Sequence, residues 1–372
     1  MPVPDRVAVA IIGGGVAGCA TAIALAQRGV RDAVIVEAGH TPAFRVGETV
    51  PPATGLLLRQ LGLWEAFTAQ GHEPCPGSAA SWGKAELGHN DFLFDPHGHG
   101  WHLDRARFDG MVAERTQAMG VPLRRDLRLA GVEPRTGGGF ALTLAPAAGD
   151  ERTLRADVLV DASGVAAGAA RRLGVARNEV DCLTVVYALL DLERPGAIAA
   201  QTLLEGAEAG WWYAAKLPQD RLIVALSTDR QEVAERGLTD PAAWTAALRA
   251  TRHVAALLDR AGTPARPPVL RTVAAPSAIL SRVAGPGWLA VGDAASSYDP
   301  ITAQGIIKAL TDGAAAGQAV AETLGGAGEA PLLAYQDGVF ARFTDYLRLR
   351  QHLYGREDRW PDAGFWRRRP LV

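Results

Sequence analysis

Three glycines near the start of the chain have the spacing of a phosphate-binding turn. Gly13, Gly15 and Gly18 fit the pattern G-x-G-x-x-G, and Glu37 follows about twenty residues later. The first glycine permits a tight turn, the second lets the backbone approach a pyrophosphate, and the third allows helix–strand packing. A carboxylate at position 37 can accept hydrogen bonds from both hydroxyls of an adenosine ribose. These residues predict a dinucleotide site without a 2′-phosphate, and a glycine turn used only for packing is the alternative.

The elements around the glycines must position them. An apolar run from Val7 to Ile12 precedes the turn and predicts a strand that is buried on both faces. A helical stretch follows, so that Val16 and Ala17 would lie in its first turn and direct free N–H groups at the phosphates. A second apolar run, 33–36, ends at the acid. The order strand, glycines, helix, strand predicts a complete βαβ unit.

Composition excludes several classes of protein. The chain has 372 residues, of which 48% are hydrophobic and 21% charged, and its formal charge is −2. It therefore has the composition of a globular protein, and we expect neither nucleic acid nor a membrane surface as its partner. The three cysteines form no C-x-x-C pair, which favours a cytoplasmic protein without structural disulfides. No apolar run approaches the roughly 20 residues of a membrane span, and no signal peptide is expected.

Several later segments carry a family resemblance. They are Phe44–Pro52, Trp101–Asp109, Asp161–Gly164, and Gly292–Ala295 with Pro300, Gly305 and Ile306 following. Together with the glycine turn they resemble the FAD-dependent monooxygenases of the p-hydroxybenzoate hydroxylase fold, in the branch of the tryptophan halogenases and geranylgeranyl reductases. Further segments resemble the flavoproteins that accompany tryptophylquinone-containing lysine and glycine oxidases: Gly71–Cys75, Ser81–Gly83, Asn90–Phe94, His97–His102 and Asp299–Ile306. Those proteins are implied to oxidise a tryptophan side chain in a partner polypeptide.

The resemblance implies a fold and its division. We expect an α/β protein in which a Rossmann-like FAD-binding domain of the GR2 type is interleaved with a β-sheet substrate domain. The FAD-binding domain would comprise residues 1–80, 101–178 and 270–330. Residues 81–100 and 179–269 would form the substrate-binding sheet, and residues 331–372 a C-terminal helical segment. Within that segment a helix is expected from about Ala334 to Trp366, and the triplet Arg367 to Arg369 is expected as a solvated end.

The resemblance also implies which residues contact FAD. They are Gly13, Gly15, Val16, Ala17, Gly18, Glu37, Arg45, Glu48, Arg105, Asp161, Gly164, Asp293, Pro300, Gly305 and Ile306. Asp293 follows a short apolar strand and could accept a hydroxyl of the ribityl chain, or it could simply cap a helix. Arg45 and Glu48 could instead form an exposed ion pair. The Asp161–Gly164 segment could be a turn without contact to the cofactor.

The substrate side has fewer signals. Trp211, Trp212 and Tyr213 follow one another on a predicted strand, so alternate rings must face opposite ways, into a pocket or into the core. His99 is expected at the mouth of the pocket. The trio His97, His99 and His102 lacks the further ligands of a familiar metal site, and no metal is predicted.

The leading hypothesis is an FAD-dependent monooxygenase that hydroxylates an electron-rich aromatic ring through a flavin C4a-hydroperoxide. The substrate could be a tryptophan side chain in a peptide or protein. Lys216, Gln304, Tyr298 and Asp299 are the candidates for orienting or protonating groups. No second nucleotide motif follows a strand, so NAD(P)H or a flavin reductase would supply electrons from outside, and O2 would be the co-substrate.

Three alternatives remain. A flavin-dependent halogenase is second, because the W-x-W-x-I-P motif of those enzymes is replaced here by Trp-Trp-Tyr-Ala-Ala-Lys-Leu-Pro from Trp211 to Pro218. The lysine that such enzymes need could only be Lys84 in the corresponding region. A reductase or dehydrogenase acting on an unsaturated substrate is third. A flavoprotein binding module without turnover is the alternative from another class.

Overall fold

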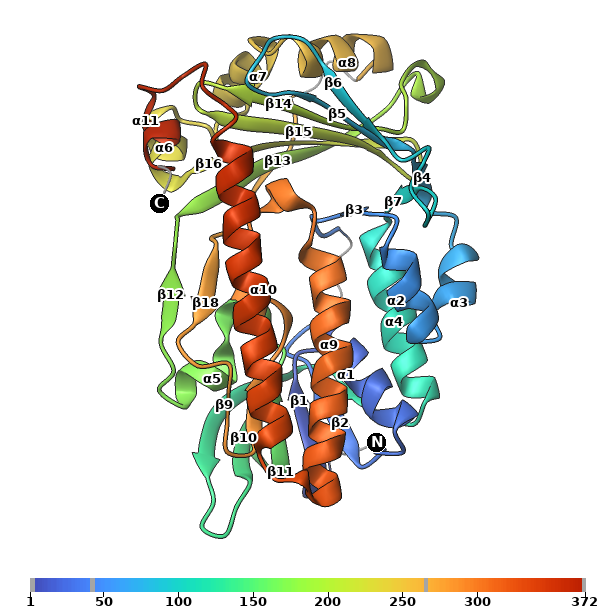
Figure 1. The fold of residues 1–372 in the computed structure, drawn as a ribbon, viewed down its shortest axis with the longest axis vertical. Coiled ribbons are helices and arrows are strands. Elements are labelled where there is room, and N and C mark those ends of the chain that lie inside the picture. The colour runs from blue at the N-terminus through green and yellow to red at the C-terminus, as the bar shows by residue number, and fades with distance from the viewer. Residues whose placement is uncertain (1–3, 41–43, 264–266, 370–372) are drawn as a thin grey trace.

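The structure is a computed structural model that describes residues 4–40, 44–263 and 267–369. Its first layer is an eight-stranded sheet, in which β1 lies between two parallel neighbours (Figure 1). The strands are β1 (Arg6–Ile12), β2 (Ala33–Val36), β8 (Leu123–Arg124), β9 (Leu127–Pro134), β10 (Phe140–Pro146), β11 (Arg152–Asp161), β19 (Ala284–Gly285) and β20 (Trp288–Ala290). Their order β19-β20-β11-β1-β2-β8, with β10 beside β11 and β9 beside β10, confirms the predicted Rossmann-like α/β domain.

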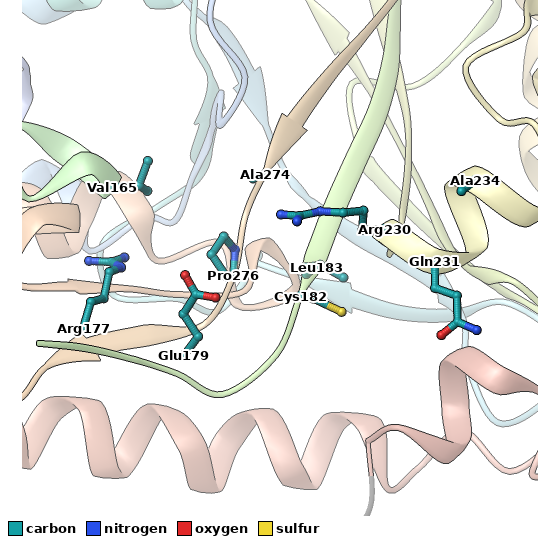
Figure 2. A pocket seen from close by; sticks show the side chains of 10 residues that line it. All are labelled: Val165, Arg177, Glu179, Cys182, Leu183, Arg230, Gln231, Ala234, Ala274 and Pro276. Carbon is teal, nitrogen blue, oxygen red and sulfur yellow. The ribbon is translucent and has the colours of Figure 1, made fainter.

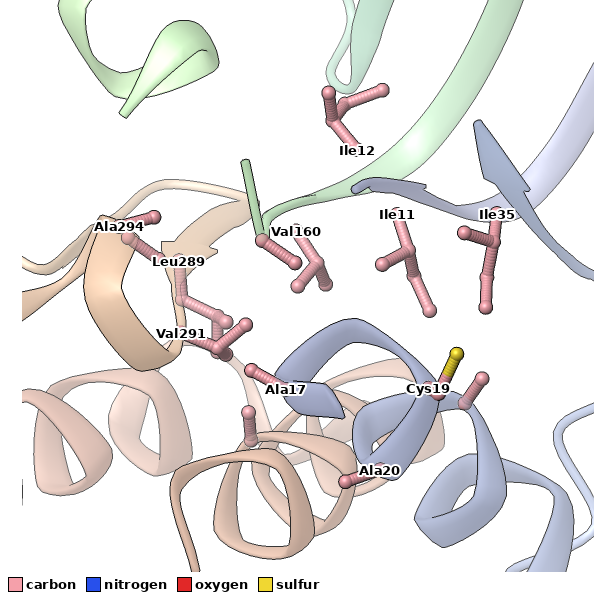
Figure 3. Close-up of a cluster of buried hydrophobic side chains, with 14 of the residues drawn as sticks. Ile11, Ile12, Ala17, Cys19, Ala20, Ile35, Val160, Leu289, Val291 and Ala294 are labelled. Atoms are coloured by element: carbon pink, nitrogen blue, oxygen red, sulfur yellow. The ribbon is translucent and has the colours of Figure 1, made fainter. Parts of the chain in front are cut away.

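Three helices lie against this sheet: α1 (Val16–Gln27), α4 (Arg105–Ala118) and α9 (Gly305–Glu322). Figure 3 shows Ile11, Ile35 and Val160 of the strands directed at the small residues of α1. Glycines bring α9 unusually close to α1. A Cβ on Gly313 would lie 2.6 Å from Cβ of Ala20, so a larger residue at position 313 would force the helices apart.

The second layer is a seven-stranded sheet, which we name the roof sheet, with the order β17-β13-β16-β15-β14-β5-β6. Its strands are β5 (Gly77–Ser81), β6 (Gly88–Asp91), β13 (Leu183–Asp191), β14 (Thr202–Ala207), β15 (Gly210–Leu217), β16 (Arg221–Asp229) and β17 (Leu270–Ala274). Helices α7 (Pro241–Arg249) and α8 (His253–Ala261) cover its outer face (Figure 1). Its inner face packs on Phe44 and Val46 of the nucleotide-binding part. Strands β5 and β17 extend beyond the predicted boundaries at residues 81 and 269, and the domain division stays a prediction.

Short strands and helices connect the two layers. One small sheet holds β3 (Thr49–Val50), β4 (Glu73–Cys75) and β7 (Gly100–His102), and another holds β12 (Arg177–Glu179), β18 (Ala278–Leu280) and β21 (Ser296–Ser297). The short helices are α2 (Thr54–Gln60), α3 (Trp64–Thr68), α5 (Gly168–Arg172) and α6 (Arg230–Glu235). Within the described residues, no helix combines the length and the apolar character that crossing a membrane requires.

The C-terminal helix α10 (Ala330–Tyr354) runs along one side of the molecule from the nucleotide-binding part to the roof sheet (Figure 1). It ends at Tyr354, and a separate turn of helix, α11 (Gly364–Arg367), follows, so the predicted single helix to Trp366 is wrong. The predicted solvated end is also wrong for Arg369. Its guanidinium is buried and pairs with the carboxylate of Asp229 at 2.7 Å.

Candidate functional site

The three glycines of the turn have different surroundings. Gly13 has a φ of +114°, and a Cβ there would lie 2.2 Å from the backbone oxygen of Ala162. A Cβ on Gly18 would lie 2.1 Å from the backbone oxygen of Gly13. Gly15 is different, because the nearest atom to its Cβ position is Nη1 of Arg45 at 3.9 Å. Gly13 and Gly18 are therefore required by close backbone packing within the turn. Gly15 instead leaves open space beside the N-terminus of α1.

Glu37 lies at the end of β2, beside the glycine turn. Its Oε2 accepts a hydrogen bond from N–H of Gly14 at 2.7 Å, and Oε1 accepts one from N–H of Gly39 at 3.2 Å. These two bonds fix the carboxylate at the edge of the turn. Each carboxylate oxygen can still accept a further hydrogen bond, as two ribose hydroxyls would require.

The loop before β3 is held by a buried arginine. Arg105 donates from Nη1 to the backbone oxygens of Val46 and Gly47 at 2.7 and 3.0 Å, and it binds Asp109 through Nε and Nη2. The half-exposed Arg45 reaches the same Asp109 at 3.4 Å. Arg45 is therefore paired with Asp109, an aspartate that was not among the predicted FAD contacts. Its sequence signals were its place in the segment Trp101–Asp109 and its four-residue spacing from Arg105 on the first turns of α4.

Glu48 points inward, with only 2% of its surface exposed. Its Oε2 has no hydrogen-bond partner among the described residues. Burial raises the pKa of the Glu48 carboxyl, although the nearby Tyr213 hydroxyl and the charge of Arg105 act in the opposite direction. The Tyr213 hydroxyl also lies 2.6 Å from Oγ1 of Thr49. An orphaned polar atom of this kind marks a place where an additional hydrogen-bonding group would fit.

Asp293 lies next to the glycine turn although it is distant in sequence. It belongs to the 3₁₀ turn Gly292–Ala294, and a Cβ on Gly292 would lie 2.7 Å from Cβ of Ala17. The Asp293 carboxylate is half exposed, and its Oδ1 lies 3.1 Å from Nζ of Lys308. Its backbone oxygen accepts a hydrogen bond from Nη1 of Arg177 at 3.1 Å. The carboxylate thus faces a lysine, and the alternative role as a helix cap is not observed.

The start of α9 lies beside the turn Gly292–Ala294, and we name the surface that Gly15, Glu37, Asp293 and Gly305 share the crevice. Pro300 opens a 3₁₀ turn, Ala303 adopts a left-handed φ of +51°, and α9 begins at Gly305. No atom lies within 4 Å of a Cβ built on Gly305, so the helix N-terminus faces open space there. Ile306 is buried and anchors the first turn. Unpaired N–H groups at this end could stabilise negative charge.

The Asp161 carboxylate binds backbone groups of the turn and short helix that follow it. It is fully buried, and its carboxylate accepts hydrogen bonds from the N–H groups of Ser163, Ala169 and Ala170. Gly164 follows with a φ of +67°. This segment shapes the backbone against which Gly13 packs, and the Asp161 carboxylate has little capacity left for a ligand.

The three consecutive aromatic residues of β15 face different layers. Tyr213 lies on the inner face, next to Thr49 and Glu48. Trp212 is on the outer face, with its ring centroid 5.1 Å from that of Trp244. Trp211 is buried beneath the C-terminal segment, and its Nε1 donates to the Tyr354 hydroxyl at 3.0 Å. The predicted alternation is confirmed, and Tyr213 has the position that best suits a pocket wall.

The remaining candidates do not converge on one point. Lys216 lies three positions after Tyr213 on β15, so its side chain is on the opposite face of the strand, and it pairs with Glu73 at 3.2 Å. Gln304 occupies the position before α9 and makes no side-chain cap. Tyr298 stacks on Tyr346 with 4.0 Å between ring centroids, and burial raises the pKa of its hydroxyl. His99 is exposed, and its Nδ1 lies 2.8 Å from the Gly100 carbonyl oxygen. The roles of these four stay predictions.

Two further buried polar residues were not predicted to have a role here: His102 was considered only in the trio with His97 and His99, and Lys308 was not considered. His102 is fully buried, with Nδ1 at 2.7 Å from the backbone oxygen of Lys216 and Nε2 at 2.9 Å from Oγ1 of Thr202. Burial lowers the pKa of His102 to about 4. Lys308 is buried on α9, where a cation near a helix N-terminus is unfavourable unless it has a partner. That unusual position was the only sequence signal for Lys308.

Comparison with known proteins identifies the family of the chain. Residues 6–345 match the FAD binding domain family, and the chain belongs to this family. It is 29% identical over 372 residues to the FAD-dependent oxidoreductase LodB of Marinomonas mediterranea, covering 96% of this chain and 95% of that protein. It is 25% identical over 339 residues to a 1H-pyrrole-2-carbonyl-peptidyl-carrier-protein brominase of Pseudoalteromonas luteoviolacea, covering 88% and 81%.

Solved structures agree with this assignment. The flavin-dependent halogenase CmlS superposes with a TM-score of 0.87 at 25% identity, over 100% of this chain and 68% of its own. The peptidyl tryptophan dihydroxylase QhpG has the same fold, with a TM-score of 0.76 at 24% identity over 98% of this chain and 78% of its own. The protein is an FAD-dependent oxidoreductase in a family of halogenases and monooxygenases.

The residues of the crevice fit FAD. The open surface at Gly15 suits a pyrophosphate, Glu37 suits the adenosine ribose, and Asp293 suits a hydroxyl of the ribityl chain. The open N-terminus of α9 at Gly305 suits the pyrimidine edge of the isoalloxazine. Direct contacts of individual residues with the cofactor remain a prediction.

Proposed function

We propose that this protein is a flavin-dependent monooxygenase that hydroxylates an electron-rich aromatic ring, with the indole of a tryptophan in a peptide or protein as the substrate. The observation that carries the proposal is the inner face of the roof sheet. It is a buried apolar cluster, formed by residues such as Val185, Ala215 and Ile223 and bordered by Phe44 and Val46, and Tyr213 packs against it near Glu48. Such a surface can hold an aromatic ring and exclude water.

The lysines favour hydroxylation over halogenation. The chain has only three, Lys84, Lys216 and Lys308. Lys84 is exposed in the loop after β5, Lys216 pairs with Glu73, and Lys308 is bound to Asp293 and Ser296. None of them lies free on the inner face of the roof sheet, where a halogenase would need an ammonium group to hold hypohalous acid. A halogenase is therefore the second candidate, supported by the brominase and by CmlS.

When bound, FAD would supply the transfer of electrons to O2, with reducing equivalents from NAD(P)H or from a flavin reductase. The chain's own residues would position and shield the reactants. The Arg105–Asp109 pair holds the loop that separates the glycine turn from the roof sheet. Tyr213 and Glu48 offer a buried hydroxyl and carboxyl that can orient or hold a proton near the substrate.

Mass spectrometry of the product tests this proposal. The FAD-loaded protein would be supplied with reduced flavin, ¹⁸O2, bromide and a tryptophan-containing peptide. A mass increase from incorporated ¹⁸O on the indole, absent without O2, is the expected result. Bromine in the product would establish the halogenase instead. Consumption of reductant with an unsaturated substrate under anaerobic conditions would indicate a reductase, and an FAD-loaded protein that turns over nothing would favour a binding module.

A further inference from the structure

A cavity of about 610 Å³ lies where β12, the ends of β13 and β17, and α6 meet, and we name it the junction cavity (Figure 2). It shares no lining residue with the apolar cluster on the inner face of the roof sheet. Its lining residues are Val165, Arg177, Glu179, Cys182, Leu183, Arg230, Gln231, Ala234, Ala274 and Pro276. Its volume is within the range of small-molecule sites, and like many such sites it lies at the junction of two structural layers.

The junction cavity has a mixed lining. Leu183, Ala274 and Pro276 provide an apolar wall, and Val165 contributes a half-exposed apolar side chain on the opposite side (Figure 2). Three charged residues surround this wall. An apolar wall with a few charged groups around it suits an amphiphilic ligand better than a simple ion.

The charges at the junction cavity are not balanced internally. Arg177 already donates to the backbone oxygen of Asp293 and to Oγ of Ser297. The guanidinium of Arg230 extends across the cavity in Figure 2 and makes no hydrogen bond or ion pair within the described parts of the chain. The Glu179 carboxylate likewise has no hydrogen-bonded partner within those parts. Among the lining residues, two arginines stand against one glutamate, and the Asp293 carboxylate also acts on Arg177, so Arg230 is the arginine left without a counter-charge among the lining residues.

We propose that the junction cavity binds a small aromatic carboxylate, whose anionic group pairs with Arg230 and whose ring packs on Leu183, Ala274 and Pro276. A guanidinium and a carboxylate match in geometry and can form two parallel hydrogen bonds. A monoanion also supplies the one negative charge that Arg230 lacks among the lining residues. A pyridine dinucleotide phosphate matches less well, because its additional negative charges would approach Glu179.

The same geometry connects the junction cavity to the flavin crevice. Arg177 lines the cavity and also holds the backbone of Asp293, which belongs to the crevice. Arg177 therefore links the wall of the junction cavity to the residue that fits the ribityl chain. This site does not depend on the proposed hydroxylation, since ligand binding requires neither O2 nor reductant.

Cys182 offers a chemical readout of occupancy. It lines the junction cavity and is exposed, whereas Cys19 and Cys75, the only other cysteines of the chain, are each 1% exposed. Alkylation of Cys182 by iodoacetamide, followed by peptide mass spectrometry, therefore reports on this cavity alone. The FAD-loaded, oxidised protein would be used without reductant, so that no turnover occurs.

The probe is N-acetyl-L-tryptophan, a monoanion, and L-tryptophanamide is the matched probe with the same ring but no carboxylate. We expect the first to slow alkylation of Cys182 at least fivefold in a saturable manner, and the second to leave the rate unchanged. Arg230→Gln should abolish the protection, and Arg230→Lys should retain part of it. Arg135→Gln, which removes an exposed arginine of the β9–β10 turn, should leave the protection intact.

Three results would overturn the proposal. They are equal protection by both probes, protection that survives in Arg230→Gln, and protection by NADPH without protection by N-acetyl-L-tryptophan. The alkylation rate without any probe, compared between wild type and Arg230→Gln, shows whether the variant retains the native cavity. Because the readout needs no turnover, it can fail while the hydroxylation assay succeeds, and the reverse also holds.

Discussion

The ammonium group of Lys308 lies 3.1 Å from Oδ1 of Asp293 and also donates to the backbone oxygen of Ser296. This pair joins the first turns of α9 to the turn that follows β20, and so it fixes one side of the flavin crevice. Because Lys308 is buried and Asp293 is half exposed, the lysine has the more restricted position and sets the direction of the carboxylate.

Replacement of Lys308 by methionine should weaken FAD binding at least tenfold. The variant keeps the length of the side chain but releases Asp293 and leaves the Ser296 oxygen without its partner, which costs about 1–3 kcal/mol of stability. Quenching of FAD fluorescence measures the dissociation constant, and urea unfolding measures the stability. Unchanged FAD affinity would show that Asp293 is not oriented by this pair.

Two alanine substitutions in the glycine turn should separate folding from binding. Gly18→Ala places a methyl group 2.1 Å from the Gly13 oxygen and should lower the melting temperature of the apoprotein strongly. Gly15→Ala meets nothing closer than 3.9 Å, so the apoprotein should fold normally and lose at least tenfold in FAD affinity. Thermal unfolding without FAD and flavin titration test the two effects. Tight FAD binding by Gly15→Ala would contradict the assigned pyrophosphate position.

Glu48 should make stability fall as the pH rises. Burial raises the pKa of its carboxyl in the folded protein above the ordinary value of 4.5, so the folded state retains a proton that the unfolded chain releases. The loss of folding stability that comes from ionising the buried carboxyl therefore begins above about pH 4.5, and it becomes constant above the pKa of the folded protein. Glu48→Gln should gain stability relative to wild type as the pH rises through this range. Glu65→Gln on the surface of α3 is the control, and urea unfolding at several pH values is the measurement.

His102 should make the stability of the protein fall as the pH decreases. Burial lowers its pKa from 6.5 to about 4, so acidification below pH 6.5 protonates the unfolded chain before the folded protein. Stability is then lost by up to about 1.4 kcal/mol per pH unit between these two values. His102→Gln should remove this component, so that its stability relative to wild type increases on acidification. The exposed His89→Gln should follow the wild-type profile; a similar change there would argue against His102.

The C-terminal arginine should stabilise the fold substantially. Arg369 binds both carboxylate oxygens of Asp229 and is buried. Removal of one partner of a buried pair costs about 3–5 kcal/mol, and the low end is expected because Arg368 also binds Asp229. Arg369→Met should therefore lose about 3 kcal/mol, whereas the exposed Arg367→Met should lose less than about 0.5 kcal/mol. Equal losses in urea unfolding would disprove the assigned pair.

The sequence predicted the elements whose signals are local. The continuous apolar run of β1 and the glycines after it identified the βαβ unit, because a buried parallel strand and a tight turn each need particular residues. Contacts between side chains far apart in the sequence have no local sequence pattern that predicts them. Asp229 and Arg369 are 140 positions apart, and their contact depends on how α11 docks against the end of β16. Likewise the alternation along β15 was predictable, but the layers that cover Trp211 and Trp212 were not.

The glycines that let α9 pack directly on α1 have a mechanical consequence. Gly313 and Gly317 approach Ala20 and Ala24 so closely that the two helices have no space to slide past one another. The glycine turn precedes one helix and Gly305 begins the other, so both predicted anchor points for the coenzyme belong to one stiff body. Any opening or closing of the site must then come from movement of the roof sheet and of the loop before β3. The distance between the glycine turn and Gly305 stays fixed.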